Sequence, residues 1–454
     1  MRLSFVILTM AVALLFTACN GQKKTNTKNK EAIAQVIGDA ELLDKIQRQT
    51  FDYFWEGAEP VSGLARERIH MDEVYPVHHK DIITTGGSGF GLMAILVGVE
   101  RGFISQEQAV ERYLKILDFL EKADRFHGVW PHWLKPDGTT APFSEKDDGG
   151  DLVESAFLVQ GLLTVKEFFD RRGTTEEEKS ISRRIQKLWE EVEWDWYTKG
   201  GEKVLYWHWS PNYGWDMNFP VGGYNEALVM YVLAAASPTH PIDAEVYHQG
   251  WARNGEIAKD TVYYGLETEL RHYEHGGSPV GPLFWAHYSY LGLNPKGLSD
   301  QYGDYWKLNQ NHALIHYKHA VENPNNYKGY GENLWGHTSS YSIKGYSVHK
   351  PDQDLGVISP TAALSSMPYT PEESMRFLRT LYQEQDSLIG KYGPYDAFSF
   401  EHNWSVPRYL AIDQGPIPVM IENYRSGMLW ELFMGNKEVQ KGLKKLGFSI
   451  NDAN

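Results

Sequence analysis

Six stretches of the chain share one pattern, in which Gly, Pro or an acidic residue precedes a run of apolar and small residues. They occupy residues 86–96, 149–158, 222–230, 281–288, 359–364 and 413–421. Each run is apolar on most faces and rich in Ala, Gly or Ser, which is typical of a helix buried among close neighbours. Gly before a helix and Pro in its first turn are start signals. The pattern therefore predicts six buried helices.

More polar segments alternate with these runs. Residues 106–122, 176–192 and 371–385 carry their charges on one face, as outer helices do. The alternation predicts an all-α fold, an (α/α)6 toroid of six inner and six outer helices. An open solenoid of repeats is the alternative, but the irregular spacing and the long aromatic loops favour the toroid. Strand signal is weak, and we expect residues 128–133 and 204–209 to form hairpin edges or loops beside a cleft.

The first residues have the pattern of an export signal. A basic start is followed by an apolar run, residues 5–16, that is too short to span a bilayer. Small residues then precede Cys19, which resembles a lipoprotein signal with Cys19 as the lipid attachment site. A plain secretory signal is the alternative. We expect a signal peptide at 1–18, a flexible tether at 19–30 and one toroid domain at 31–454.

Further sequence features bear on location and stability. Cys19 is the only cysteine, so no disulfide can form within the chain. Residues 20–24 lack the acidic pair expected of a surface-export signal, which favours a periplasmic location over the cell surface. We expect a monomer that is attached to a membrane through its N-terminal lipid.

Charge and aromatic content narrow the function classes. The formal net charge is −15, which argues against nucleic acid as a partner. The chain has 15 Trp and 27 Tyr, an excess that suits a cleft in which flat rings pack on sugar faces. Core packing is the alternative role for these rings. The candidate sugar platforms are Trp130, Trp133, Trp207, Trp209, Trp215, Trp285, Trp335 and Trp404, and we select Trp133, Trp209 and Trp285 as substrate-binding residues.

Acidic residues lie at or near three of the predicted helix starts. Hydrolysis of a glycosidic bond needs two carboxyl groups, one to protonate the leaving oxygen and one to activate water or attack. An Asp at a helix start can instead be an N-cap, and Asp151 with Glu154 matches a capping box. A helix N-terminus also favours the ionised form, so a general acid there needs burial or a neighbouring carboxylate. The candidates are Asp147, Asp151, Glu154, Glu226 and Asp413.

Three motifs carry a resemblance to a known family. Residues 84–91, 148–154 and 413–416 resemble the bacterial glycoamylase-like domain proteins, which include β-1,2-glucanases, and the resemblance covers nearly all of the chain after the tether. It implies an (α/α)6 toroid that cleaves β-1,2-glucan or its oligosaccharides with inversion. It further implies Glu226 as general acid and Asp413 as general base, relayed or direct. Asp147, Asp151 and Glu154 would then be supporting carboxylates.

Other residues carry less specific signals. Arg66 follows a Gly turn and could bind sugar hydroxyls or form a surface ion pair, and His287 lies in the fourth apolar run. The spacing of His132, His208, His287 and His337 matches no zinc pattern, so no metal is expected. The Gly-rich run 86–89 has no following Lys-Ser/Thr, which argues against a nucleotide. No cofactor is expected.

Three rival functions remain open on the sequence. The same toroid could cleave another glucan, such as an α-1,4 glucan. A glycan-binding lipoprotein without catalysis would keep the aromatic residues but would not need acidic residues at three helix starts. A polysaccharide lyase acts on uronic-acid polymers, which a chain with a net charge of −15 suits less well.

Overall fold

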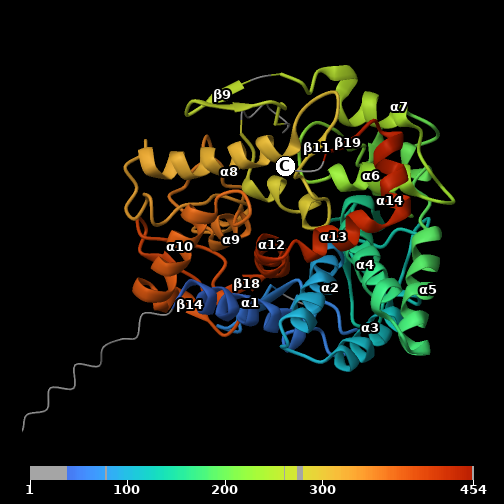
Figure 1. Ribbon diagram of the computed structural model, residues 1–454, viewed down its shortest axis with the longest axis horizontal. Helices are drawn as coiled ribbons and strands as arrows, with labels where there is room; N and C mark the ends of the chain where they lie inside the picture. The colour runs from blue at the N-terminus through green and yellow to red at the C-terminus, as the bar shows by residue number, and fades with distance from the viewer. Residues whose placement is uncertain (1–37, 77–78, 260, 273–279, 452–454) are drawn as a thin grey trace, which may run out of the picture. The chain divides into compact units, whose positions relative to one another are not determined.

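Buried α-helices form in five of the six stretches with the apolar pattern (Figure 1). The computed structural model describes residues 38–76, 79–259, 261–272 and 280–451, and Gly38–Asn454 form one unit. Cys19 and the predicted boundaries at residues 18 and 30 lie outside the described residues. The inner helices are α2 (Thr85–Glu100), α4 (Leu152–Arg172), α6 (Leu228–Ala236), α9 (Pro360–Ser365) and α12 (Pro416–Arg425), the last preceded by α11 (Ala411–Gln414).

The fourth stretch departs from the prediction. It forms two 3-10 turns, η4 (Leu283–Ala286) and η5 (Ser289–Leu291), in place of an α-helix. Its backbone N–H groups find partners in a neighbouring loop, because Leu283 N donates to the carbonyl of His337 at 3.1 Å and Phe284 N to the hydroxyl of Thr338 at 3.2 Å. These N–H groups lie at the start of the turn, where a helix supplies no partner from within itself, so the loop satisfies them.

Amphipathic helices lie outside this inner ring and confirm the three predicted outer segments. Ser105 and Thr175 begin two of them with complete capping boxes. In Figure 1, α12 lies near the middle of the view with α1, α10 and α8 outside it. The alternation is that of an (α/α)6 toroid, as predicted. The outer helices include α1 (Asp39–Trp55), α3 (Gln106–Leu120), α5 (Glu176–Glu190), α8 (Tyr305–Glu322) and α10 (Pro371–Glu384), and shorter ones are α7 (Ala244–Val246), α13 (Met428–Gly435) and α14 (Lys437–Lys445).

Short antiparallel strands border the loops at the helix ends. β1 (Arg68–His70) pairs with β18 (Arg408–Leu410), and β2 (Ile83–Thr84), β3 (Trp133–Leu134) and β4 (Thr140–Ala141) form one sheet. The other pairs are β5 (Gly150–Asp151) with β7 (His208–Trp209), β6 (Leu205–Tyr206) with β8 (Pro220–Val221), β9 (Thr261–Tyr263) with β10 (Leu266–Thr268), β11 (Leu298–Ser299) with β19 (Ser449–Ile450), β12 (Ser340–Ser342) with β13 (Gly345–Ser347), β14 (Ile389–Gly390) with β15 (Gly393–Pro394), and β16 (Phe398–Ser399) with β17 (Trp404–Ser405).

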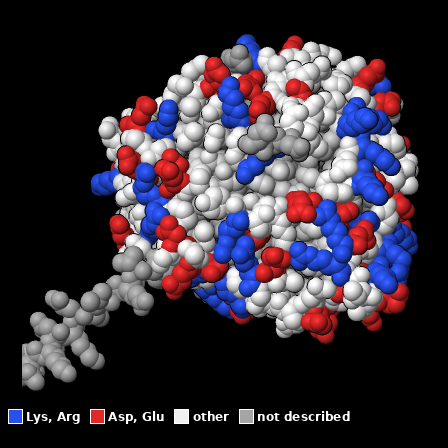
Figure 2. Space-filling view, in the orientation of Figure 1, with Lys and Arg blue, Asp and Glu red and all other residues white. Residues whose placement is uncertain are grey.

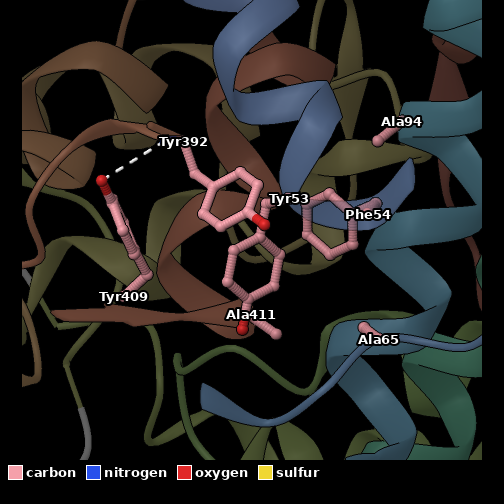
Figure 3. Packing of buried hydrophobic residues seen from close by; sticks show 7 residues of the cluster. All are labelled: Tyr53, Phe54, Ala65, Ala94, Tyr392, Tyr409 and Ala411. Atoms are coloured by element: carbon pink, nitrogen blue, oxygen red, sulfur yellow. Dashed lines mark hydrogen bonds between the residues drawn. The ribbon is translucent and has the colours of Figure 1, made fainter. Parts of the chain in front are cut away.

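An aromatic cluster joins the first described helix to the last part of the ring (Figure 3). Within it, the hydroxyl of Tyr409 accepts a hydrogen bond from Tyr392 N at 3.3 Å. Tyr53 also donates to the carbonyl of Arg66 at 2.8 Å, which holds the strand that follows. The cluster comprises Tyr53, Phe54, Ala65, Ala94, Tyr392, Tyr409 and Ala411. It therefore fixes β1 and β18 beside each other.

The surface of the described part carries both signs of charge. Figure 2 shows Lys and Arg side chains interspersed with Asp and Glu over the visible face, without a large field of one sign. Exposed pairs such as Arg379 with Asp39, 2.5 Å apart, add little stability because water screens them. Among the described residues, no helix combines the length and apolar character that a bilayer crossing requires.

α2 and α4 pack against each other at Gly89 and Gly161, and this contact leads to a prediction about stability. A Cβ at Gly89 would lie 2.1 Å from the carbonyl oxygen of Phe157, and one at Gly161 would lie 2.2 Å from that of Gly89. Because backbone is on the other side, Gly89→Ala should lower the free energy of unfolding by about 2–3 kcal/mol, measured by urea denaturation. The matched control is Gly38→Ala, where nothing lies within 4 Å and about 1 kcal/mol or less is expected. Equal stability of the two variants would contradict the tight packing.

Candidate active site

A cavity of about 420 Å³ opens where the loops at one end of the helices meet. A wider groove of about 980 Å³ shares His79, Trp133 and Pro142 with it, and a smaller pocket of about 190 Å³ shares Trp207, Glu226 and Phe284. The three hollows adjoin one another and together form a cleft whose wall carries aromatic side chains. The cavity is lined by Glu67, Arg68, His79, Thr84, His132, Trp133, Pro142, Phe143, Glu154, Phe157, Trp207, Glu226, Phe284, Tyr288, Tyr341, Tyr346, Leu410 and Ile412.

Glu226 lies in the wall between the cavity and the smaller pocket, because it lines both. Its side chain is 8% exposed and it precedes α6, which begins at Leu228. Ala227 N donates to the side chain of Asn225 at 3.0 Å, so the turn at the helix entry is closed by Asn225. A carboxyl group at this place can reach a sugar chain that occupies both hollows.

Glu154 lines the same cavity from the first turn of α4. One of its carboxyl oxygens accepts a hydrogen bond from Gly86 N at 2.9 Å. Burial raises the pKa of Glu154 to about 7, opposed by His132 and reinforced by the Asp151 carboxylate. Glu154 can therefore carry a proton near neutral pH, although it belongs to a helix N-terminus.

Asp151 is the N-cap of α4 and anchors the surrounding loops. It accepts hydrogen bonds from Glu154 N at 2.9 Å, from Nδ1 of His132 at 2.7 Å and from the indole of Trp207 at 3.1 Å. Burial acts to raise the pKa of Asp151, but the hydrogen bond and charge of His132 hold it below the ordinary value. Asp151 is thus ionised, and it does not line the cavity.

His132 and His208 lie beside these carboxyl groups, and we call Asp147, Asp151, Glu154, His132 and His208 together the charged layer. Burial lowers the pKa of His132, but Glu154 and Asp151 outweigh it and raise the pKa to about 9. Nε2 of His208 lies 3.2 Å from a carboxyl oxygen of Asp147. His132, Asp147 and Asp151 are close enough to hold a cation, but the raised pKa keeps His132 protonated near neutral pH, and a protonated imidazole has no lone pair for a metal. The layer therefore acts as a set of positioning groups.

Asp413 lies in α11 behind the cavity wall. It is 1% exposed and its side chain is hydrogen-bonded to that of Asp396, which accepts from Tyr341 N at 2.7 Å. Burial and the second carboxyl group raise the pKa of Asp413 well above its ordinary value, and burial raises that of Asp396 to about 6. The two carboxyl groups therefore share one proton. Burial raises the pKa of both Tyr288 and Tyr346, and the nearby Asp413 adds to the shift.

The structure distributes the other candidates over different places. Trp133 lines the cavity and the groove, and Trp285 lines the smaller pocket. Arg66 donates to the carbonyls of residues 57 and 58 at 2.8 and 2.9 Å, which makes it a loop anchor. His287 is buried against Ser366 at 3.0 Å, and Trp209 packs on the rings of residues 126, 127 and 196. Arg66, Trp209 and His287 lie outside the lining of the three hollows.

Sequence reasoning missed several groups that the fold brings into the cavity wall or directly behind it. Asp396 lies in a loop between short strands, so no helix-start pattern marks it. Tyr341 and Tyr346 come from the β12–β13 hairpin in a region without a strong element signal. Glu67 lies in a loop immediately before β1 and between two arginines, and this position is the one signal that could have indicated it.

The comparisons with known proteins agree with this arrangement. The family model "Glycoamylase: Putative glucoamylase" matches residues 218–437. The exo beta-1,2-glucooligosaccharide sophorohydrolase (non-reducing end) of Parabacteroides distasonis is 43% identical over 449 residues, covering 93% of this chain and 60% of the relative. The chain therefore spans about three fifths of that relative's length.

Two solved structures are similar over nearly all of the described chain. An endo-β-1,2-glucanase from Chitinophaga pinensis, in complex with sophorotriose and glucose, is 58% identical with a TM-score of 0.89, covering 91% of this chain and 99% of that one. A β-1,2-glucanase from Parabacteroides distasonis is 44% identical with a TM-score of 0.85, covering 90% of this chain and 60% of that one. The chain belongs to the glycoamylase-like family that includes these β-1,2-glucanases.

Proposed function

We propose that the protein is a glycoside hydrolase that cleaves β-1,2-glucan or its oligosaccharides with inversion. The observation that carries the proposal is the position of Glu226, buried in the wall that two adjoining hollows share. A sugar on each side of Glu226 would place a glycosidic oxygen beside its carboxyl group. The names of the similar β-1,2-glucanases support the choice of linkage.

In this mechanism Glu226 is the general acid and donates a proton to the leaving oxygen. The pair of Asp396 and Asp413 is the base. Because the pair holds one proton on two carboxyl groups, one carboxylate is free to accept the proton of the attacking water, directly or through a substrate hydroxyl. The protonated form of Glu154 can donate a hydrogen bond to a sugar hydroxyl in the cavity.

The aromatic wall would supply binding energy. Trp133, Tyr341 and Phe284 lie along the lining and offer flat faces to sugar rings. Asp147 and Asp151 would act indirectly, because they hold His132 and His208 beside the carboxyl group of Glu154. This division of roles needs no cofactor.

We also propose that the protein is exported and anchored in a membrane through a lipid on Cys19, as a monomer in the periplasm. The apolar run before Cys19 and the small residues next to it support export and acylation. Bacterial lipoproteins of this kind carry several acyl chains, and two or more give firm membrane attachment.

The first test is product analysis on linkage-defined glucans: β-1,2, β-1,3, β-1,4, β-1,6 and α-1,4. We expect release of short β-1,2 oligosaccharides or sophorose alone, separated by chromatography, with product length distinguishing endo from exo action. Proton NMR of the first products should show the anomer opposite to that of the substrate bond. Cleavage of the α-1,4 glucan alone would overturn the linkage, and binding without products would indicate a glycan-binding protein.

Two isosteric substitutions test the assigned roles. Glu226→Gln removes the transferable proton, and Asp413→Asn leaves the pair one ionisable carboxyl group. Each should lower kcat by about 10²-fold to 10⁴-fold while the melting temperature stays within a few degrees of wild type. Steady-state kinetics and thermal melts on the same samples measure this. Activity within tenfold of wild type would remove the residue from its role, and a fall in melting temperature alone would identify Asp413 as structural.

The shared proton has a separate signature in stability. Because the folded-state pKa of Asp396 is raised to about 6, its contribution is fully present below the unfolded value and is lost as pH rises through the folded one. The stability difference between wild type and Asp396→Asn should therefore shift against wild type between pH 4 and 6, by up to about 1.4 kcal/mol per pH unit. Urea denaturation across that range measures the shift. A constant difference would show that the two carboxyl groups do not share a proton.

A further inference from the structure

A second cluster of titratable side chains lies apart from the cleft. His319 projects from α8, and His337 and Asp354 come from the connection 323–359 between α8 and α9. Their side chains are 2%, 0% and 1% exposed, respectively. None of the three lines the hollows described above.

The spacing of the donor atoms suits a small ion. Nε2 of His319 lies 2.9 Å and Nε2 of His337 lies 3.8 Å from the same carboxyl oxygen of Asp354, and one donor atom of each residue lies within 4.8 Å of the others. In a tetrahedral zinc site with bonds of about 2.0–2.1 Å, neighbouring ligand atoms are about 3.4 Å apart. The two distances lie on either side of that value, so small side-chain shifts would complete the geometry.

An unpaired nitrogen marks the same place. Nδ1 of His337 is buried without a hydrogen-bond partner among the described residues, and Nε2 of the same ring is hydrogen-bonded to the hydroxyl of Tyr330 at 3.1 Å. Burying an unpaired imidazole nitrogen is unfavourable unless another group satisfies it.

Hydrogen bonds to the other polar atoms of His319 and Asp354 hold these side chains in place. Nδ1 of His319 is hydrogen-bonded to the hydroxyl of Tyr264 at 2.8 Å. The other carboxyl oxygen of Asp354 accepts from the hydroxyl of Tyr330 at 2.7 Å and from Gly356 N at 2.8 Å. Such outer contacts fix the orientation of imidazole and carboxylate ligands around protein metal ions.

We propose that His319, His337 and Asp354 bind one divalent transition-metal ion of the zinc class at a structural site. Two imidazole nitrogens and one carboxylate suit zinc better than calcium or magnesium, which prefer oxygen ligands. The ion would tie the connection 323–359 to α8 in a chain whose only cysteine is Cys19. That connection carries Tyr341 and Tyr346 of the cavity wall, so the ion would also stiffen one side of the cleft.

The test measures metal content and melting temperature of the purified chain without a polyhistidine tag. After removal of metals with EDTA and dialysis, we expect zinc to bind at one ion per chain by plasma mass spectrometry. Free zinc at 100 times its Kd should raise the melting temperature by about 3 °C. Cobalt added in place of zinc should give the intense visible absorption of a tetrahedral site.

The decisive variant is His337→Gln, which removes one of the imidazole ligands. It should still melt cooperatively in EDTA but lose the bound ion and the zinc-dependent rise, and Asp354→Asn, which keeps the size of the side chain, should do the same. The matched control is His402→Asn, at an exposed histidine bonded to the carbonyl of Leu355, which should keep both. Absence of binding by the wild type, or an equal zinc-dependent rise in either ligand variant, would overturn the site. No substrate is involved, so the result is independent of the proposed hydrolase activity.

Discussion

The antiparallel pairing of β1 with β18 is the contact on which the cleft depends. It places Arg68 opposite Leu410 and so joins the first and last parts of the helical ring. The lining residues come from six separated regions of the chain, from Glu67 to Ile412, and none of them forms a site by itself. The aromatic cluster of Tyr53 offsets the entropy of closing such a long loop, because it buries large rings at the closure point.

Closure of the ring buries Asp151, Glu154 and Asp413. Burial acts to raise the pKa of each group, and the hydrogen-bond donors around each carboxyl group then decide whether it is ionised. Asp151 accepts from an imidazole, an indole and a backbone N–H, and remains ionised. Glu154, three residues later, has one backbone donor in the same layer and is raised to a pKa of about 7. Asp413 faces Asp396, and the pair must keep a proton. Groups of one kind thereby acquire the different charges that acid–base chemistry requires.

The sequence predicted the parts of this arrangement that local patterns encode. Apolar runs indicated α2, α4 and α12, and charge periodicity indicated α3, α5 and α10, because a helix shows its buried face every three or four residues. The run at 281–288 had the same composition and still formed 3-10 turns, and the N–H groups at its start bond to the loop at residues 337–338. Composition does not encode that partner.

The same distinction applies to the candidate site residues. Glu226 and Asp413 lie beside helix starts, where a local sequence pattern could indicate them, whereas Asp396 is brought to Asp413 by tertiary contact alone. Arg66 and His287 are of types that suit sugar binding. Arg66 contacts the backbone carbonyls at 57–58 and the carboxylate of Asp81, and His287 contacts the hydroxyl of Ser366. A residue type states what a side chain can do, and the neighbours supplied by the fold decide whether it does so.

The imidazoles of His319 and His337 extend this argument to the connection between α8 and α9. They lie too far apart in sequence for a short metal-binding motif, so the sequence indicated no metal. The connection is long and carries one wall of the cavity, so something must hold it in register. Apolar side chains could do so without leaving a buried nitrogen unsatisfied, whereas two imidazoles beside a buried carboxylate are favourable only when their polar atoms are paired, and Nδ1 of His337 is not. A bound ion would convert that unfavourable polar core into the attachment that the wall needs.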